Sequence, residues 1–332
     1  MVLILRRKKL VTYSKYGYLF AIPFIVAFSI FTLYPIVYTL IIGFTNHAGI
    51  IPPKLAILED PLENFKYLFK KTPSGKTSFF LRGLSNTARI WVINFIPQIS
   101  LALILAAWFT DNRVKVRGQG FFKVVFYLPN IITAATIAIL FRSLFGYPIG
   151  PINDLLKSLH IVKDPFFFLN KITPTRAIVE FIQFWQWYGS TMITLIAAVI
   201  GINPEIFEAS EIDGANRMQK FFKITLPCIR PILLFTLVTS LIGGLSMFDI
   251  PMCLSAGGPQ DSTMTVAIYI YNEAFSKPYK YNRAAAASVI LFFIIIICSS
   301  ILFYLLRDKD AAKLQKLKKA ELKKARLEAK GA

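Results

Sequence analysis

Residues whose types and spacing could support catalysis are few in this sequence. The run SGKT, which ends at Thr77, matches the end of a nucleotide-binding P-loop, but the glycine required five positions before Gly75 is replaced by Lys70. The three cysteines have no CxxC spacing, and neither of the two histidines lies in an HExxH pattern. We therefore expect this chain to contain no catalytic centre, no metal site and no bound cofactor.

A better candidate for chemistry is a set of polar and aromatic residues that could hold a ligand. Gln183, Trp187 and Ser190 lie at i, i+4 and i+7 in the stretch EFIQFWQWYGS, so a helix would place them on one face. An amide, an indole and a hydroxyl together suit a ligand with both polar and apolar faces. The alternative is that Trp187 packs at a membrane interface, where aromatic side chains gather.

A second candidate is the polar stretch EASEIDGANRMQKFFKITLP, residues 208–227, between two very apolar segments. Asn203 can cap a helix whose first residue is Pro204, and Gly214 suits the left-handed end of that helix. Asn216 can then begin a second short helix. The resulting mixture of anionic and apolar side chains suits a protein partner. The alternative is an amphipathic connector that lies on the membrane.

The elements that position these residues are expected to be membrane-spanning helices. Of the 332 residues, 55% are hydrophobic and 17% are charged, whereas about a quarter of the residues of a soluble domain are charged. A helix needs about 20 apolar residues to cross the hydrocarbon. The segments that qualify are residues 18–44, 88–109, 121–146, 177–202, 229–250 and 284–306. We expect an all-α membrane protein with six transmembrane helices.

The distribution of lysine and arginine predicts the direction of these helices. Basic residues gather in the N-terminal segment, in the second connection, in the loop 203–228 and in the C-terminal tail, which all fall on one side of a six-span chain. We therefore expect a cytoplasmic basic N-terminus at 1–17, a membrane domain at 18–306 and a basic cytoplasmic tail at 307–332. The net charge of +20 suits contact with anionic membrane lipid. No nucleic-acid-binding signature appears, so we expect no nucleic acid partner.

Ionisable residues inside spans indicate function by default. Glu180 and Asp249 are expected near the outer ends of their helices, where lipid headgroups would solvate them. A transporter coupled to protons or ions would instead place carboxylates near the middle of the membrane. The sequence therefore disfavours that class.

The polar loop resembles a known family signature. Glu208-Ala209-Ser210, three residues, Gly214, nine residues and then Ile224-x-Leu226-Pro227 is similar to the EAA signature of permease subunits of ATP-binding-cassette (ABC) importers. Only Ser210 departs from the common alanine. The stretches YLPNIITAATIAILFRSLFG, MFDIPMCLSAGGPQDST and YNRAAAASVILFF resemble the maltose-type (sugar) permease branch, and the likeness covers residues 18–307.

The resemblance implies an importer type I permease core in the membrane of a prokaryotic cell. Such a subunit forms half of the path of a sugar or oligosaccharide, as a heterodimer with a second permease subunit. An extracytoplasmic solute-binding protein delivers the substrate, and a separate cytoplasmic ATPase dimer hydrolyses ATP, so this chain is expected not to be an enzyme. The implied contacts with the ATPase are Glu208, Ala209, Ser210, Asp213, Gly214, Ile224, Leu226 and Pro227. Glu208 would pair with a basic residue, Ala209 and Ser210 would keep the contact close, and Gly214 would permit the turn.

The resemblance also implies which residues contact the substrate. In the fourth span these are Gln183, Trp187 and Ser190, and the matching positions of the fifth span are Ser240, Gly244 and Met247, again at i, i+4 and i+7. Gly244 and Met247 differ from the polar residues of the maltose permease, which indicates a glycan other than maltose. Two alternatives remain: a permease of this architecture for glycerol phosphate, a peptide or an amino acid, and a membrane scaffold that recruits a partner without transport.

Overall fold

The protein is described by a computed structural model that covers residues 14–51, 53–72, 75, 77–111, 117–307 and 321. The predicted basic N-terminus up to residue 13, most of the tail after residue 307 and parts of the SGKT run and of the second connection lie outside the described residues. Within the described part the chain is helical, and its one β-bridge joins Thr45 to Ile57.

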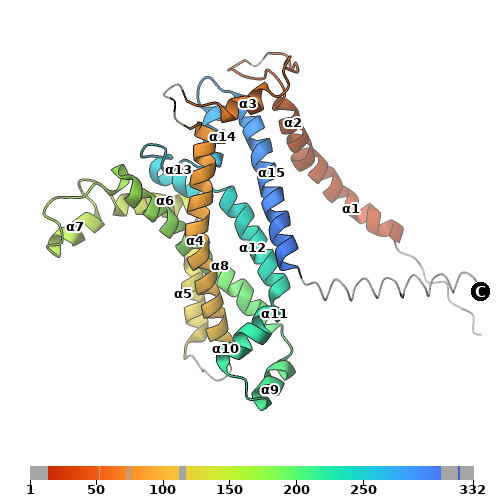
Figure 1. The fold of residues 1–332 in the computed structure, drawn as a ribbon, viewed down its shortest axis with the longest axis vertical. Helices are drawn as coiled ribbons and strands as arrows, with labels where there is room; N and C mark the ends of the chain where they lie inside the picture. Colours follow the sequence, from red (N-terminus) through yellow and green to blue (C-terminus); the bar gives the residue numbers. More distant parts are fainter. Residues whose placement is uncertain are drawn as a thin grey trace, which may run out of the picture.

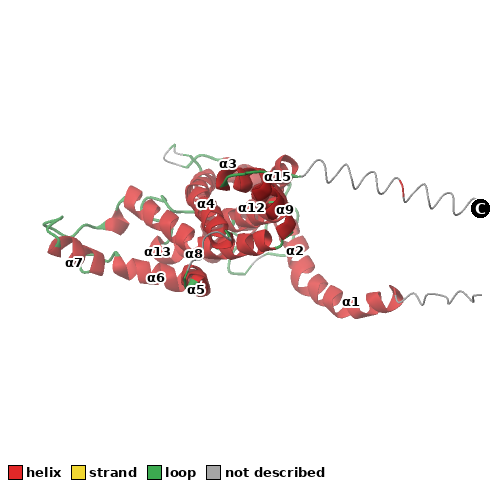
Figure 2. Ribbon diagram, turned by 90° about the horizontal axis from the view of Figure 1, so that it is seen from below, coloured by secondary structure: helices red, strands yellow, loops and turns green. Residues whose placement is uncertain are grey.

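Long helices form the body of the molecule (Figure 1). They are α4 (Phe79–Thr110), α8 (Ile172–Ile200), α12 (Arg230–Leu245) and α15 (Tyr281–Leu306). The first apolar segment is a continuous helical stretch made of α1 (Ser14–Phe28), the π-helical turn η1 (Ser29–Leu33) and α2 (Tyr34–Ile42). It leans away from the body in both views, and very little of it is buried (Figures 1 and 2).

The number of apolar helices agrees with the predicted membrane protein. The segments long and apolar enough to cross a membrane are Gly17–Ile42, Phe79–Thr110, Arg230–Ser255 and Tyr281–Leu306. Two bent helix pairs raise the possible spans of the described chain from four to six, if each pair counts as one span. The pairs are Gln119–Ile131 with Ala134–Leu144, and Ile172–Ile200 with Pro204–Ile212. The predicted all-helical membrane fold is therefore confirmed, although two of its predicted spans are interrupted.

The predicted third span, 121–146, is wrong as a single helix. It consists of α5 (Gln119–Ile131) and α6 (Ala134–Leu144), which meet at an angle of 89°. Ile132 and Thr133 are extended, and the Thr133 hydroxyl accepts a hydrogen bond from the backbone N–H of Thr136 at 3.3 Å, which starts a new helix. At 1.5 Å per residue, α5 is about 20 Å long, short of the hydrocarbon thickness of about 30 Å.

The predicted fifth span, 229–250, is interrupted as well. Helix α12 ends at Leu245, and α13 (Asp249–Ser255) begins after a short non-helical segment. The buried Thr265 hydroxyl donates a hydrogen bond of 2.9 Å to the carbonyl of Met247. This bond replaces the backbone hydrogen bond that the carbonyl would accept within a continuous helix. Met247 therefore does not continue the α12 face as predicted. Helices α6 and α13 pack against each other.

The central interface of the body joins α4 to α8. Its buried core includes small residues of α4, Ala102 and Ala106, beside Met192 and Leu195 of α8. Small residues are typical of helix contacts in membranes, because they allow two backbones to approach closely and gain dispersion contacts. This interface fixes the α8 face on which Gln183 and Trp187 lie.

Short helices and loops cover the end of the body that carries α14 (Val266–Phe275). Here Asn86 of α4 donates hydrogen bonds to the carbonyls of Asp261 at 2.6 Å and Met264 at 3.0 Å. Arg82 forms an ion pair of 2.6 Å with Asp261, and Arg176 of α8 donates to the side-chain oxygen of Asn86 at 3.0 Å. These contacts fix the segment that connects α13 to α14. Helix α3 (Glu63–Phe69) lies at the same end, whereas α7 (Pro151–Ser158) projects to the side of the body beyond α6 (Figure 1). The 3-10 turn η2 (Phe168–Asn170) precedes α8.

The opposite end of the body carries the polar loop, which we call the α9 end. Its elements are α9 (Pro204–Ile212), α10 (Arg217–Lys220), the π-helical turn η3 (Phe221–Thr225) and α11 (Leu226–Cys228). Figure 1 shows α9 and α10 below the body, far from α3 and α14. The two candidate sites of the sequence therefore lie in different parts of the molecule, one inside the helical body and one at its end.

Candidate functional site

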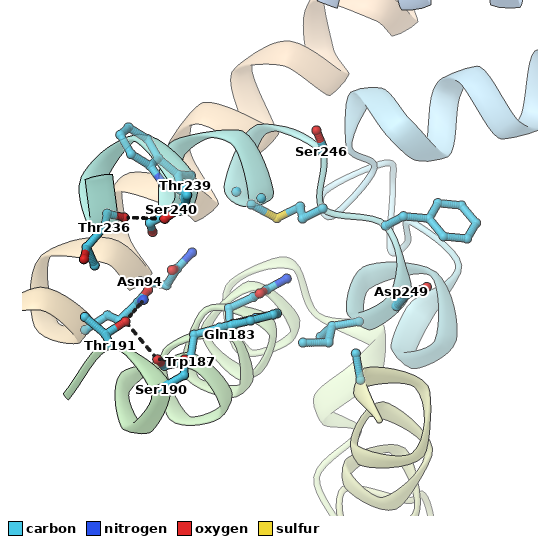
Figure 3. A pocket seen from close by; sticks show the side chains of 18 of the residues that line it. Asn94, Gln183, Trp187, Ser190, Thr191, Thr236, Thr239, Ser240, Ser246 and Asp249 are labelled. Carbon is cyan, nitrogen blue, oxygen red and sulfur yellow. Dashed lines mark hydrogen bonds between the residues drawn. The ribbon is translucent and has the colours of Figure 1, made fainter. Parts of the chain in front are cut away.

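A cavity of about 440 Å³ lies between α4, α8, α12 and the start of α13 (Figure 3). It brings together both sets of residues that the sequence associated with substrate. The members of these sets that line it are Gln183, Trp187, Ser190, Ser240, Gly244 and Met247. Two stretches of chain that are separated by the whole α9 end thus meet at one place.

Several polar groups of this cavity have no side-chain partner among the described residues, and two of them belong to the predicted site. The amide of Gln183 and the hydroxyl of Ser240 make no side-chain hydrogen bond to any described residue, although the Gln183 side chain is 8% exposed. Buried amides are normally hydrogen-bonded, since an unpaired one costs free energy. Both groups are therefore available to a ligand. The Ser190 hydroxyl, by contrast, donates to the carbonyl of Trp187 at 3.1 Å and offers a ligand its remaining acceptor capacity.

The two tryptophans of the α8 stretch differ in their surroundings. Trp187 lines the cavity and is 47% exposed, so one face of its indole is free for an apolar surface of a ligand. Trp185 packs into the protein, with its ring 5.8 Å from that of Phe141. Of the two, Trp187 is therefore the candidate for ligand stacking.

Helix α4 adds a third wall that the sequence interpretation missed. Trp91, Asn94 and Gln98 line the cavity, and the Gln98 amide donates to the Thr191 hydroxyl at 3.0 Å. Their spacing of i, i+3 and i+7 in WVINFIPQ is the same signal that identified the α8 face. It was a usable signal, because a polar stripe inside an apolar span is rarely accidental.

Gly244 lines the cavity and also makes room for a side chain of α4. A side chain at this position would place its first carbon 1.9 Å from Cδ1 and 2.6 Å from Nε1 of Trp91. The indole of Trp91, which also stacks on Phe95 at 5.0 Å, occupies the space that a residue at 244 would fill. The space that a side chain at position 244 would fill is therefore occupied by an aromatic side chain from α4.

The remaining polar residues of the spans have contrasting environments. Asp249 begins α13 and its exposed side chain lines the cavity. The side chain of Glu180 is only 12% exposed and lies 3.8 Å from Arg89 of α4. The expectation that headgroups solvate Glu180 is therefore wrong, because this carboxylate is largely buried beside the half-exposed side chain of Arg89.

The α9 end has the predicted helix-turn-helix form. The Asn203 side chain accepts from the backbone N–H of Glu205 at 3.1 Å, and Gly214 has a φ of +73°, the left-handed conformation that favours glycine. Asn216 and Gln219 form a reciprocal capping box at the start of α10. Local sequence rules were sufficient here because each cap uses neighbours within a few residues.

The two faces of α9 are distinct. Phe207 packs on the core of α4 and α8, and the Ser210 side chain is 6% exposed, with its hydroxyl donating to the carbonyl of Phe207 at 2.6 Å. Ser210 therefore faces the protein itself, and its expected role in keeping the contact with a partner close stays a prediction. Glu208, Ala209 and Asp213 are exposed.

One ion pair holds this end to the body, a second lies within it, and neither involves Glu208. Arg217 lies 3.1 Å from Asp111 at the end of α4, and Lys220 pairs with Glu211. Glu208 makes no ion pair or side-chain hydrogen bond with any residue that the structure describes. The last members of the signature lead into α12: Ile224 and Leu226 are partly buried and Pro227 is exposed.

Comparison with known proteins identifies the family. The sequence profile described as "Binding-protein-dependent transport system inner membrane component" matches residues 82–311. The lactose transport system permease protein LacF of Rhizobium radiobacter is 30% identical over 90% of this chain and 96% of its own length. The arabinooligosaccharides transport system permease protein AraP of Bacillus subtilis is 30% identical, over 80% of each chain.

A solved structure shares the fold. It is that of a bacterial ABC transporter involved in the import of the acidic polysaccharide alginate, with a TM-score of 0.71 and 24% identity over 89% of this chain and 96% of that chain. The protein is accordingly a multi-pass component of the prokaryotic plasma membrane, and its family is a transport component and not an enzyme. The chain belongs to the family of inner membrane components of binding-protein-dependent transport systems.

Proposed function

We propose that this chain is the permease subunit of an ABC importer and forms half of the translocation path for a sugar or oligosaccharide. The observation that carries this proposal is the cavity, in which two separately predicted helix faces meet. It offers an indole face from Trp187 and unpartnered polar groups from Gln183 and Ser240. Sugar rings have an apolar face and a rim of hydroxyls, so this combination is the one that a sugar requires.

The partners of the proposed importer are a second permease subunit, a cytoplasmic ATPase dimer and an extracytoplasmic solute-binding protein. The α9 end faces the cytoplasm in this proposal, as do both termini, and Glu208 meets a basic residue of the ATPase. Glu208 is exposed and has no partner among the residues that the structure describes, which supports this contact. The apolar surface of the first span, little of which is buried, faces lipid or the second permease subunit.

Purification of the chain by an affinity tag from its own cells tests the proposal. We expect the ATPase and the second permease subunit to copurify in mild detergent, and the solute-binding protein to join when the sugar is present. Deletion of the chain is expected to abolish uptake of that sugar. If the chain purifies alone and its deletion changes no uptake, it is a scaffold and the proposal is wrong.

The relation between Gly244 and Trp91 predicts a specific effect on transport. The variant Gly244→Ala forces the Trp91 indole out of its position, at a repacking cost of about 1–3 kcal/mol, and we expect weaker substrate binding by the cavity. Uptake should need a higher substrate concentration for half-saturation. Gly243→Ala is the matched control, because Gly243 also lines the cavity but its added carbon would meet nothing within 4 Å. Equal uptake by both variants would contradict the role of Trp91.

A further inference from the structure

The cavity has a distinctive charge. Its lining contains amides, hydroxyls and aromatic rings, and its one ionisable side chain is the carboxylate of Asp249. Among the described residues that line it there is no lysine, arginine or histidine. The Asp249 carboxylate makes no ion pair or hydrogen bond with the described part of the chain, so none of the described lysines and arginines neutralises it.

The cations nearest to the cavity along α4 and α8 are engaged elsewhere. Arg89 lies beside Glu180 at 3.8 Å. Arg176 donates to the carbonyl of Ser262 at 2.8 Å and to the side chain of Asn86 at 3.0 Å, in the contacts that fix the segment before α14. Neither arginine lines the cavity. A negatively charged ligand would therefore lose hydration without gaining a cationic partner, and it would approach a carboxylate of the same sign.

We propose that this subunit's half of the path selects neutral oligosaccharides over uronic acid oligosaccharides, with Asp249 as a specificity-determining residue. The inference rests on the proposed function and names its substrate class. Specificity of this kind comes from repulsion of the wrong ligand as much as from attraction of the right one. The similar structure whose importer takes the acidic polysaccharide alginate shares the fold with this chain, but the charge of a ligand is selected by the side chains of the lining, not by the fold.

The test uses the full chain, together with any subunits that copurify, in nanodiscs of uncharged lipid. The probes are matched pairs that differ only by oxidation at C6: galactotriose with trigalacturonate, and mannotriose with trimannuronate. Binding is followed by tryptophan fluorescence, because Trp91 and Trp187 line the cavity. We expect at least one neutral trisaccharide to bind, and its uronate partner to bind about tenfold more weakly or worse, about 1.4 kcal/mol.

Variants of the lining separate the contribution of Asp249. In Asp249→Asn the difference in affinity between the neutral and the acidic probe is expected to become smaller, mainly because the uronate binds more tightly. Asp164→Asn is the matched control, since Asp164 is an exposed carboxylate that does not line the cavity. Because Asp249 begins α13, a second variant guards against misfolding: Ser246→Arg adds a cation to the lining and should also strengthen uronate binding.

Each outcome decides the matter. A uronate that binds the original chain as tightly as its neutral partner overturns this inference and leaves the proposed sugar transport intact. If the neutral probe still binds about tenfold more tightly than the uronate in both Asp249→Asn and Ser246→Arg, the charge of the lining does not determine specificity. Failure of every probe, neutral and acidic, overturns the binding of sugar in this cavity, and this inference with it.

Discussion

Replacement of Gly189 by alanine is expected to destabilise the protein more than any other single methyl group added to its helices. Gly189 lies in α8 where the backbone of α5 crosses it, and an added carbon would lie 2.1 Å from the carbonyl oxygen and 2.9 Å from the carbonyl carbon of Phe126. These are backbone atoms, which a side-chain rotation cannot move. Helix α5 must therefore shift away from α8, at a cost of about 1–3 kcal/mol or more.

The sign of this effect is informative, because alanine is otherwise the better helix former by about 1 kcal/mol. Gly243→Ala makes the same change inside α12, where the added carbon meets nothing within 4 Å, and it should leave stability unchanged or raise it. Thermal unfolding of the two purified variants in the same detergent measures the difference. If Gly189→Ala unfolds at the temperature of Gly243→Ala, the close contact of α5 with α8 is wrong.

The long helices and the α9 end could be predicted because their signals are local. Apolar runs of sufficient length define spans, and the caps at Asn203, Gly214 and Asn216 involve residues close in sequence. The interruption of the third span has one local cap, at Thr133, which was not recognised, and the interruption of the fifth span carries no such signal. The break before α13 is held by the hydroxyl of Thr265, which donates to the carbonyl of Met247 from 18 residues further along the chain, after α13. The sequence stays apolar through both breaks, so a prediction from the length of apolar runs joins the two helices on either side into one span.

The sequence could predict which helix faces line the candidate cavity, but not what each residue does there. Periodicity placed Gln183 and Trp187 together, and the same method applied to α4 would have found Asn94 and Gln98. It could not show that Trp91 fills the space beside Gly244, because that contact joins two helices. The inward direction of Ser210 was hidden for the same reason: a short polar residue suits either face of α9, and only packing against α4 and α8 decides between them.

The double variant Glu208→Lys with Gly214→Asp is expected to abolish uptake while the protein still reaches the membrane. Glu208 is exposed and unpaired in the described chain, so its reversal disturbs no contact within the subunit. Under the proposed function it would leave a charge unpaired in the interface with the ATPase, a loss of about 2–5 kcal/mol. Uptake by whole cells and the amount of chain in isolated membranes are measured together. Asp164→Lys, the reversal of an exposed carboxylate away from the α9 end, is the control and should transport normally.

Gly214 can act through its backbone or through the space beside it, and two single variants distinguish these roles. Its φ of +73° penalises most side chains, yet an added carbon would meet no atom of the described residues within 4 Å. Gly214→Ala incurs a backbone cost of about 1–2 kcal/mol, whereas Gly214→Asn adds a larger side chain that tolerates this conformation better. If a partner needs the space, both variants lose uptake and copurify less ATPase. Normal uptake by Gly214→Asn, with a defect confined to Gly214→Ala, would show that the turn alone matters, and normal uptake by the double variant would exclude the docking role of this end.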